Sequence, residues 1–180
     1  MLKKPVRLIL IALAAFLVFV PLHGYLSSRN CARMVICISN LKQLGLALNM
    51  YACDYQGKFP TDLSLLYPGY VSNLTTFLCP IKAHTSRLNE QDVLKNFTVC
   101  YEYIPGLTRE DDNGILIVFD RKDNHAHIFG HHRDSRNAAF VGGRVQAFNP
   151  LIPSTNRQSW EQVWATHQKL LQERSHKSQP

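Results

Sequence analysis

Apolar residues recur every three or four positions between Cys31 and Tyr55, which is the period of an α-helix. Gly57 and Pro60 follow the last of them and form a helix stop signal. An uncharged and largely apolar run, Leu8 to Leu22, precedes this region. We therefore expect a nearly continuous N-terminal rod, in which an apolar helix leads, with at most a kink, into an amphipathic helix.

Beyond residue 60 the pattern of apolar residues first predicts short segments and then changes to the period of β-strands. Residues 61–70 predict a short helix that ends at Pro68 and Gly69, and residues 82–96 predict either an exposed loop or a weak helix. After that, apolar and polar residues alternate, which is typical of β-strands. The predicted strands are 97–103, 115–119, a segment around 127–129, 137–141 and 144–148.

The last two strands and the tail give the clearest local signals. Gly142 and Gly143 separate the strands, and we expect a hairpin with a type I′ turn, which needs positive φ at both positions. Residues 159–172 carry one apolar face, and Ser159 with Gln162 fits a capping box. We expect this C-terminal helix to pack on the body and residues 175–180 to fray.

These elements predict an α+β fold, in which a long N-terminal helix, transmembrane and then amphipathic, packs on a small antiparallel sheet and a further helix ends the chain. A length of 180 residues suits one domain with an appendage. The predicted division is a membrane anchor and flank over 1–30, an α+β domain over 31–150, and a C-terminal helix and tail over 151–180.

The anchor prediction rests on length and flanking charge. Lys3, Lys4 and Arg7 precede the apolar run, and counting it through Leu26 gives nineteen residues, close to the roughly 20 that a bilayer core requires. The positive-inside rule then places the N-terminus in the cytoplasm. We expect a single-pass protein of the inner (cytoplasmic) membrane with a periplasmic body; a cleaved signal peptide and a buried core helix are the alternatives.

The net charge argues against a nucleic-acid partner. The chain has 20 Lys+Arg and 13 Asp+Glu, a formal charge of +7, and six of the basic residues precede Asp54, the first acidic residue. The remainder has 14 basic and 13 acidic residues, and so lacks the clustered positive field that phosphate binding needs.

Five cysteines leave the redox state open. A disulfide between Cys79 and Cys100 is one possibility in an oxidising compartment, and buried thiols are the other. No Cys-x-x-Cys pattern indicates zinc or redox chemistry.

Residues 120–134 hold four of the eight histidines and are the best candidate for chemistry. On a strand, His125 and His127 would share a face, and with Asp120, Asp134 or His132 they could hold a divalent metal. Polar loop residues near a strand edge are the simpler interpretation. We expect no cofactor and no catalytic residue, because no phosphate loop, dinucleotide fingerprint or nucleophile motif is present. The acidic segment 110–114 is interpreted as a solvated turn rather than a calcium site.

Several segments, in order along the chain, resemble the type II secretion pseudopilins and related pilin-like proteins. They are the run Ser39-Asn40-Leu41-Lys42-Gln43-Leu44-Gly45, the segment Phe77-Leu78-Cys79-Pro80, and a C-terminal hairpin preceded by a histidine. The resemblance implies a pilin-like fold, a structural or assembly role, and the lipid bilayer and other pseudopilins or secretion subunits as partners. The motif positions are Asn40, Leu41, Lys42, Gln43, Tyr51, Gly57, Pro60, Cys79, Pro80, His132, Gly142 and Gly143.

This chain departs from that family at two places. The family's precursors are cut after a Gly that precedes Phe or Met and carry a Glu soon after, whereas no such Gly and no acidic residue occur before Asp54. The family's Asp-Gly-His has become Gly142-Gly143-Arg144. We expect an unprocessed, non-enzymatic pilin-like protein. The alternatives are an exported metal-dependent enzyme or metal-binding protein using residues 120–134, and an exported binding module.

Overall fold

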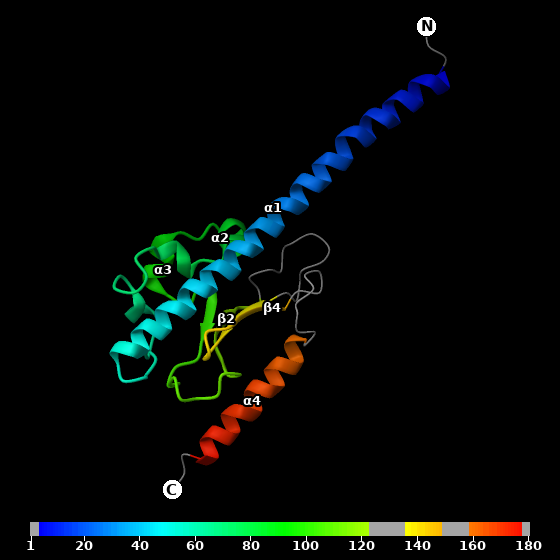
Figure 1. Cartoon of the computed structure of the whole chain (residues 1–180). Helices are drawn as coiled ribbons and strands as arrows, with labels where there is room; N and C mark the ends of the chain where they lie inside the picture. Colours follow the sequence, from blue (N-terminus) through cyan, green and yellow to red (C-terminus); the bar gives the residue numbers. More distant parts are fainter. Residues whose placement is uncertain (1–3, 123–135, 149–158, 178–180) are drawn as a thin grey trace.

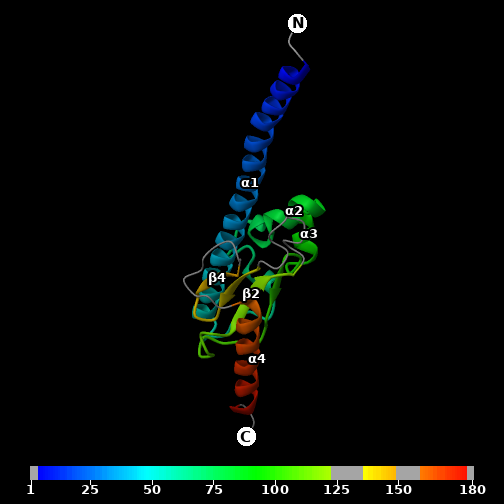
Figure 2. The ribbon, with the colours of Figure 1, turned by 90° about the vertical axis from the view of Figure 1, so that its right-hand side faces the viewer.

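Helix α1 (Lys4–Asp54) is a single helix of 51 residues, and its N-terminal part extends away from the rest of the chain (Figures 1 and 2). The computed structural model describes residues 4–122, 136–148 and 159–177. Pro21 lies inside α1, which remains one continuous helix through it although proline cannot donate a helical hydrogen bond.

The C-terminal part of α1 packs on the body of the protein. Its buried residues follow the predicted amphipathic period, and Gly57 ends the helix with a φ of 81° and an N–H that donates to the Ala52 carbonyl at 2.7 Å. The side chains that α1 contributes to the core are Met34, Cys37, Leu41, Leu44, Ala47, Leu48 and Ala52.

Four strands form one antiparallel sheet in the order β1-β2-β3-β4, so each strand pairs with its neighbour in sequence. The register pairs Tyr101 with Asp120 and Ala138 with Gln146, and an irregularity lies between Leu116 and Val118. The strands are β1 (Tyr101–Tyr103), β2 (Leu116–Asp120), β3 (Arg136–Phe140) and β4 (Val145–Phe148). The prediction of an α+β fold with a small antiparallel sheet and a C-terminal helix is therefore confirmed.

The sheet lies between α1 and α4 (Trp160–Lys177), as Figures 1 and 2 show. On the α1 side, Ile117, Val118, Ala139 and Val141 join the core that includes the helix. On the opposite side, a second apolar cluster contains Leu116, Phe119, Ala138, Phe140, Phe148 and Val163, with Trp160 and Trp164 packed against it.

Between α1 and β1 the chain forms four short helical segments, which corrects the predicted elements there. The expected helix over 61–70 is only a 3₁₀ turn, in which the Asp62 side chain accepts a hydrogen bond from the N–H of Ser64. Residues 82–96 are neither a loop nor one weak helix, because two short helices cover them. These segments are η1 (Leu63–Leu66), η2 (Leu74–Phe77), α2 (Pro80–Ser86) and α3 (Glu90–Lys95).

The strand predicted over 97–103 is wrong in its first half, because only Tyr101–Tyr103 pairs with β2. The Asn96 side chain accepts a hydrogen bond from the N–H of Thr98 at 2.9 Å. Such a side-chain contact bends the backbone and competes with a strand ladder.

The hairpin is present, but its turn differs from the prediction. Phe140 N–H donates to the Arg144 carbonyl at 2.9 Å, which leaves a loop of three residues, and Gly143 N–H donates to the Phe140 carbonyl at 2.8 Å. Only Gly143 has a positive φ, 78°. Three-residue hairpin loops commonly place one residue in the left-handed region, so the type I′ prediction, which needed Gly142 there as well, is wrong.

The predicted capping box at the start of α4, the last helix of the chain, is confirmed. Ser159 N–H donates to Gln162 Oε1 at 2.9 Å, and Gln162 N–H donates to the Ser159 hydroxyl at 3.3 Å. The helix continues to Lys177, so the predicted fraying does not occur over residues 175–177. Arg174 contributes to this order, because its guanidinium contacts Asp111 at 2.6 Å and donates to the Gly106 carbonyl.

The predicted single-pass location in the inner membrane is contradicted. Among the residues that the structure describes, no helix has a stretch both long and apolar enough to cross a bilayer.

Candidate functional site

Two of the motif segments, far apart in sequence, meet in the structure. Asn40 of α1 is buried, and its side-chain amide donates to the Leu78 carbonyl at 2.9 Å. One helical turn further on, Gln43 accepts a hydrogen bond from the Thr76 hydroxyl at 3.4 Å. These side chains fix the segment that connects η2 to α2 against α1.

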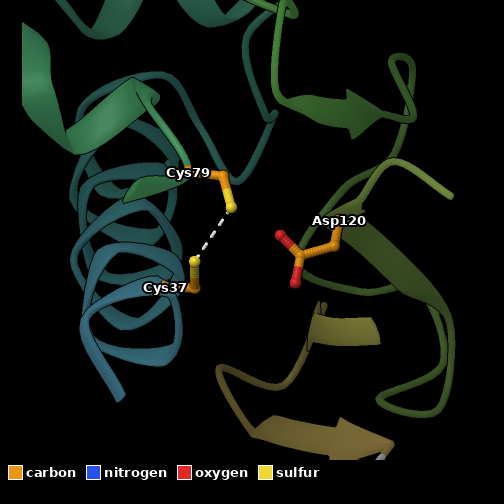
Figure 3. Close-up of side chains that lie close together, drawn as sticks. All are labelled: Cys37, Cys79 and Asp120. Atoms are coloured by element: carbon orange, nitrogen blue, oxygen red, sulfur yellow. Dashed lines mark hydrogen bonds between the residues drawn. The ribbon is translucent and has the colours of Figure 1, made fainter. Parts of the chain in front are cut away.

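The same contact brings two cysteines together. The Cys37 Sγ of α1 lies 3.1 Å from the Cys79 Sγ, which belongs to the residue that caps α2. Both side chains are fully buried, and both are thiols rather than halves of a disulfide. Figure 3 shows the two sulfur atoms pointing toward each other, with the Asp120 carboxylate on the opposite side of the site.

Asp120 is the last residue of β2, and its side chain is completely buried. One carboxylate oxygen accepts two hydrogen bonds from Asn137 of β3, from the backbone N–H at 3.0 Å and from the side-chain amide at 2.7 Å. Burial of a carboxylate is costly unless hydrogen bonds compensate for the lost water, and these two bonds supply part of that compensation.

The environment keeps the Cys37 and Cys100 thiols protonated at neutral pH. The pKa of Cys37 is raised far above its usual value, first by the contact with the Cys79 thiol and then by burial. Burial raises the pKa of the neighbouring Cys100 to about 12, although a hydrogen bond with the Cys79 backbone acts in the opposite direction. Because the thiolate is the nucleophile, these thiols are poor candidates for nucleophilic catalysis in the folded protein.

Cys37, Cys79 and Asp120 form the one group with metal-ligand chemistry found among the described residues, with ligand atoms within 4.8 Å of one another. Thiolate and carboxylate ligands suit zinc, whose closed structural sites use four ligands. The sequence offered Asp120 only as one candidate ligand beside histidines, and the structure places it beside two cysteines instead. The other candidate ligands, His125, His127 and His132, lie outside the described residues together with the segment around 127–129.

Cys37 was missed as a site residue. On the sequence it is one apolar position on the amphipathic face, and a single sequence does not show which distant residue it meets. The available signal was its position three residues before Asn40, on the same side of the helix. The sequence left a disulfide or buried thiols open for Cys79 and Cys100, and the structure shows buried thiols, with the Cys79 sulfur facing Cys37.

The remaining motif residues have structural positions. Tyr51 stacks on Tyr55, with ring centroids 4.1 Å apart. The Gly57 carbonyl accepts from the Arg109 N–H at 2.8 Å, and the Pro60 carbonyl accepts from the Tyr103 hydroxyl. Leu41 is buried in the core, Lys42 is exposed, Pro80 begins α2, and Gly142 and Gly143 lie in the hairpin loop.

Comparisons of this chain with protein-family models, curated proteins and solved structures find no match.

Proposed function

We propose that this protein is a pilin-like assembly subunit, in which the projecting part of α1 packs among the α1 helices of other copies. Its role is structural rather than enzymatic, and the resemblance of the motifs implies a pseudopilus-like assembly of type II secretion. The observation that carries the proposal is the exposure of apolar side chains on every side of this part of α1.

The projecting part of α1 is long. Residues 4–33 precede Met34, the first buried residue among those whose burial the structure describes, and correspond to about 45 Å of helix. Consecutive residues of a helix point 100° apart, so exposed apolar residues at adjacent positions cover its whole circumference. The large apolar side chains with 49% to 67% of their surface exposed are Ile11, Leu13, Phe16, Leu17, Val18, Phe19, Val20, Leu22 and Tyr25.

A helix that is apolar on all sides requires more than one neighbour. A contact with one partner would cover a single face and leave the others in water. Contiguous exposed apolar surface of this extent is uncommon on a monomer and indicates an interaction site. A bundle of α1 helices from several copies covers every face with the same chemistry, which is why we favour other copies as the occupant.

The outer face of α1 along the body offers a continuation of this contact. Val35, Leu46 and Met50 are exposed, although their neighbours on the helix form the core. Neighbouring subunits packed through the projecting part of α1 could therefore extend their contact along the body.

The test is the association state of the full chain and of two matched double variants. Phe16→Gln with Leu17→Gln places amides on the projecting part of α1, and Leu65→Gln with Leu94→Gln changes two exposed leucines of the body. Burial of each exposed apolar side chain contributes about 1–2 kcal/mol, so the first pair should weaken association by about 2–4 kcal/mol, or roughly 30- to 700-fold in Kd.

Sedimentation velocity at micromolar concentration gives the readout. We expect the wild type and the body variant to sediment as oligomers well above the 20.5 kDa of one chain, and the α1 variant to shift toward the monomer. A monomeric wild type would contradict the proposal. So would a wild type that stays monomeric in buffer and binds phosphatidylcholine vesicles, because the occupant of the apolar surface would then be lipid.

A further inference from the structure

We propose that Cys37 and Cys79 are a disulfide-forming pair that covalently connects α1 to the start of α2. This inference is independent of the assembly proposal, because it concerns the interior of the body. Its basis is the geometry in Figure 3, in which the two sulfur atoms face each other from separate elements at 3.1 Å.

The separation of the sulfur atoms supports bond formation. Non-bonded carbon atoms pack at about 3.5–4.0 Å, and a disulfide bond is about 2.05 Å long. The Cys37 and Cys79 sulfurs, at 3.1 Å, are already closer than packed carbons. Closing the remaining distance of about 1 Å requires only a small adjustment of the short segment between η2 and α2.

Neighbouring contacts hold this segment in register with α1. Asn40 donates to the Leu78 carbonyl at 2.9 Å, next to Cys79, and so positions the Cys79 backbone three residues along α1 from Cys37. The Cys37 sulfur also has a hydrogen bond with the backbone of Ile81, in the first turn of α2. The pairing is therefore determined by several contacts and not by the sulfur atoms alone.

The chemistry is thiol–disulfide exchange with a low-molecular-weight or protein disulfide as oxidant. One thiolate of the pair attacks the oxidant and forms a mixed disulfide, releasing one thiol. The second thiolate attacks the mixed disulfide and releases the other thiol. The two cysteines lose two protons and two electrons, and the oxidant takes up both as two thiols. Because both side chains are buried in the folded protein, the first step occurs before the Leu78–Pro80 segment docks on α1.

A metal ion is the competing occupant of this place. Tetrahedral zinc with bonds of about 2.3 Å to sulfur would separate two cysteine sulfurs by roughly 3.8 Å, more than the observed 3.1 Å. The cluster supplies three ligand side chains among the described residues, and one oxygen of Asp120 already accepts two hydrogen bonds from Asn137. The incomplete set of ligands, rather than the distance between the sulfur atoms, thus favours the disulfide.

The experiment uses the full wild-type chain, so that no variant has to fold for the result to count. The protein is refolded in a mixture of reduced and oxidised glutathione, then denatured in guanidinium with iodoacetamide and digested without reductant. We expect a cross-linked pair of peptides that contains Cys37 and Cys79, a mass before alkylation about 2 Da below that of the reduced chain, and alkylation at the other three cysteines, Cys31, Cys53 and Cys100.

A second measurement tests burial of the bond. Reduction by dithiothreitol should be at least about tenfold slower in the folded protein than in guanidinium. Cys53→Ser is the matched control, since Cys53 is an exposed cysteine of the same helix, and it should leave the cross-link intact. Cys79→Ser should abolish it.

Three results would overturn the proposal. One is complete alkylation of Cys37 and Cys79 after refolding under oxidising conditions. Another is a cross-link between Cys79 and Cys100 in place of the expected one. The third is one zinc ion per chain, by native mass spectrometry of protein prepared without chelator, that is lost in Cys79→Ser, because the two sulfurs would then be metal ligands.

Discussion

Asn40 provides the sharpest test of how α1 holds the body. The Asn40 side chain donates at 2.9 Å to the buried Leu78 carbonyl, and the one other side-chain donor described there, the Tyr101 hydroxyl, is 3.5 Å away. In Asn40→Ala, the carbonyl keeps only this long contact. Loss of a hydrogen bond that leaves a buried partner unsatisfied costs about 1–3 kcal/mol, and the better helix propensity of alanine returns roughly 0.5 kcal/mol. We expect a net destabilisation of about 1–2 kcal/mol.

Asn49→Ala is the matched control on the same helix. Asn49 donates at 2.9 Å to the Gly45 carbonyl within its own helix, in a partly buried position. The Gly45 carbonyl also takes part in the regular backbone hydrogen bonding of α1. Losing the Asn49 side-chain bond should therefore change the free energy of unfolding only slightly. We expect Asn49→Ala to lie within about 0.5 kcal/mol of the wild type.

Urea unfolding followed by far-UV circular dichroism measures both variants, at two protein concentrations so that association does not contribute. Equal free energies of unfolding for Asn40→Ala and Asn49→Ala would refute the idea that Asn40 fixes the η2–α2 connection. A urea midpoint equal to that of the wild type, with a changed dependence of the unfolding free energy on urea concentration, would also contradict this role of Asn40. The lost bond should affect stability and not the surface exposed on unfolding.

Three further variants test the packing and the turn. Gly45→Ala should stabilise the protein by about 0.5–1 kcal/mol in urea unfolding, because the new Cβ would lie 3.7 Å from that of Ala139, an ordinary contact distance. Gly45→Leu should instead destabilise it by about 1–3 kcal/mol, because the larger side chain does not fit. The opposite order would contradict the close packing of α1 on β3. Gly143→Ala should cost about 1 kcal/mol in thermal unfolding because φ is 78°, and Gly143→Asn should cost less. The His167 imidazole accepts a hydrogen bond from the Leu116 N–H, and burial lowers its pKa, so its contribution to stability is complete above about pH 6.5 and is lost as the pH falls below that value. The urea midpoint should therefore fall more between about pH 7.5 and pH 5 in the wild type than in His167→Gln, and equal falls would contradict this role.

The sequence was most informative where local chemistry determines the structure. Alternation around Gly142 and Gly143 located the hairpin, and Ser159 with Gln162 located the start of α4. The turn type was not predictable in the same way, because the loop length depends on which residues of β3 and β4 pair. That register is set by packing of the sheet against α1 and α4, far from the turn.

The candidate site could not be predicted for a similar reason. Cys37, Cys79 and Asp120 lie on α1, at the start of α2 and at the end of β2, and no local period connects these three positions. Asp120 was interpreted as part of a polar segment, whereas it is buried beneath α1 with Asn137 as its hydrogen-bond donor. Tertiary packing brings these side chains together, and a single sequence does not record which ones meet.

The central claim, that other copies cover the projecting part of α1, is tested most directly by site-specific photo-crosslinking in cells. A photoreactive amino acid at Phe16 probes this part of the helix, and one at Leu94, an exposed apolar position of the body, serves as control. We expect Phe16 to form crosslinks whose peptides map to α1 of a second copy, while Leu94 forms none of these. Crosslinks from Phe16 to lipid alone, or an absence of any intermolecular product, would contradict the account.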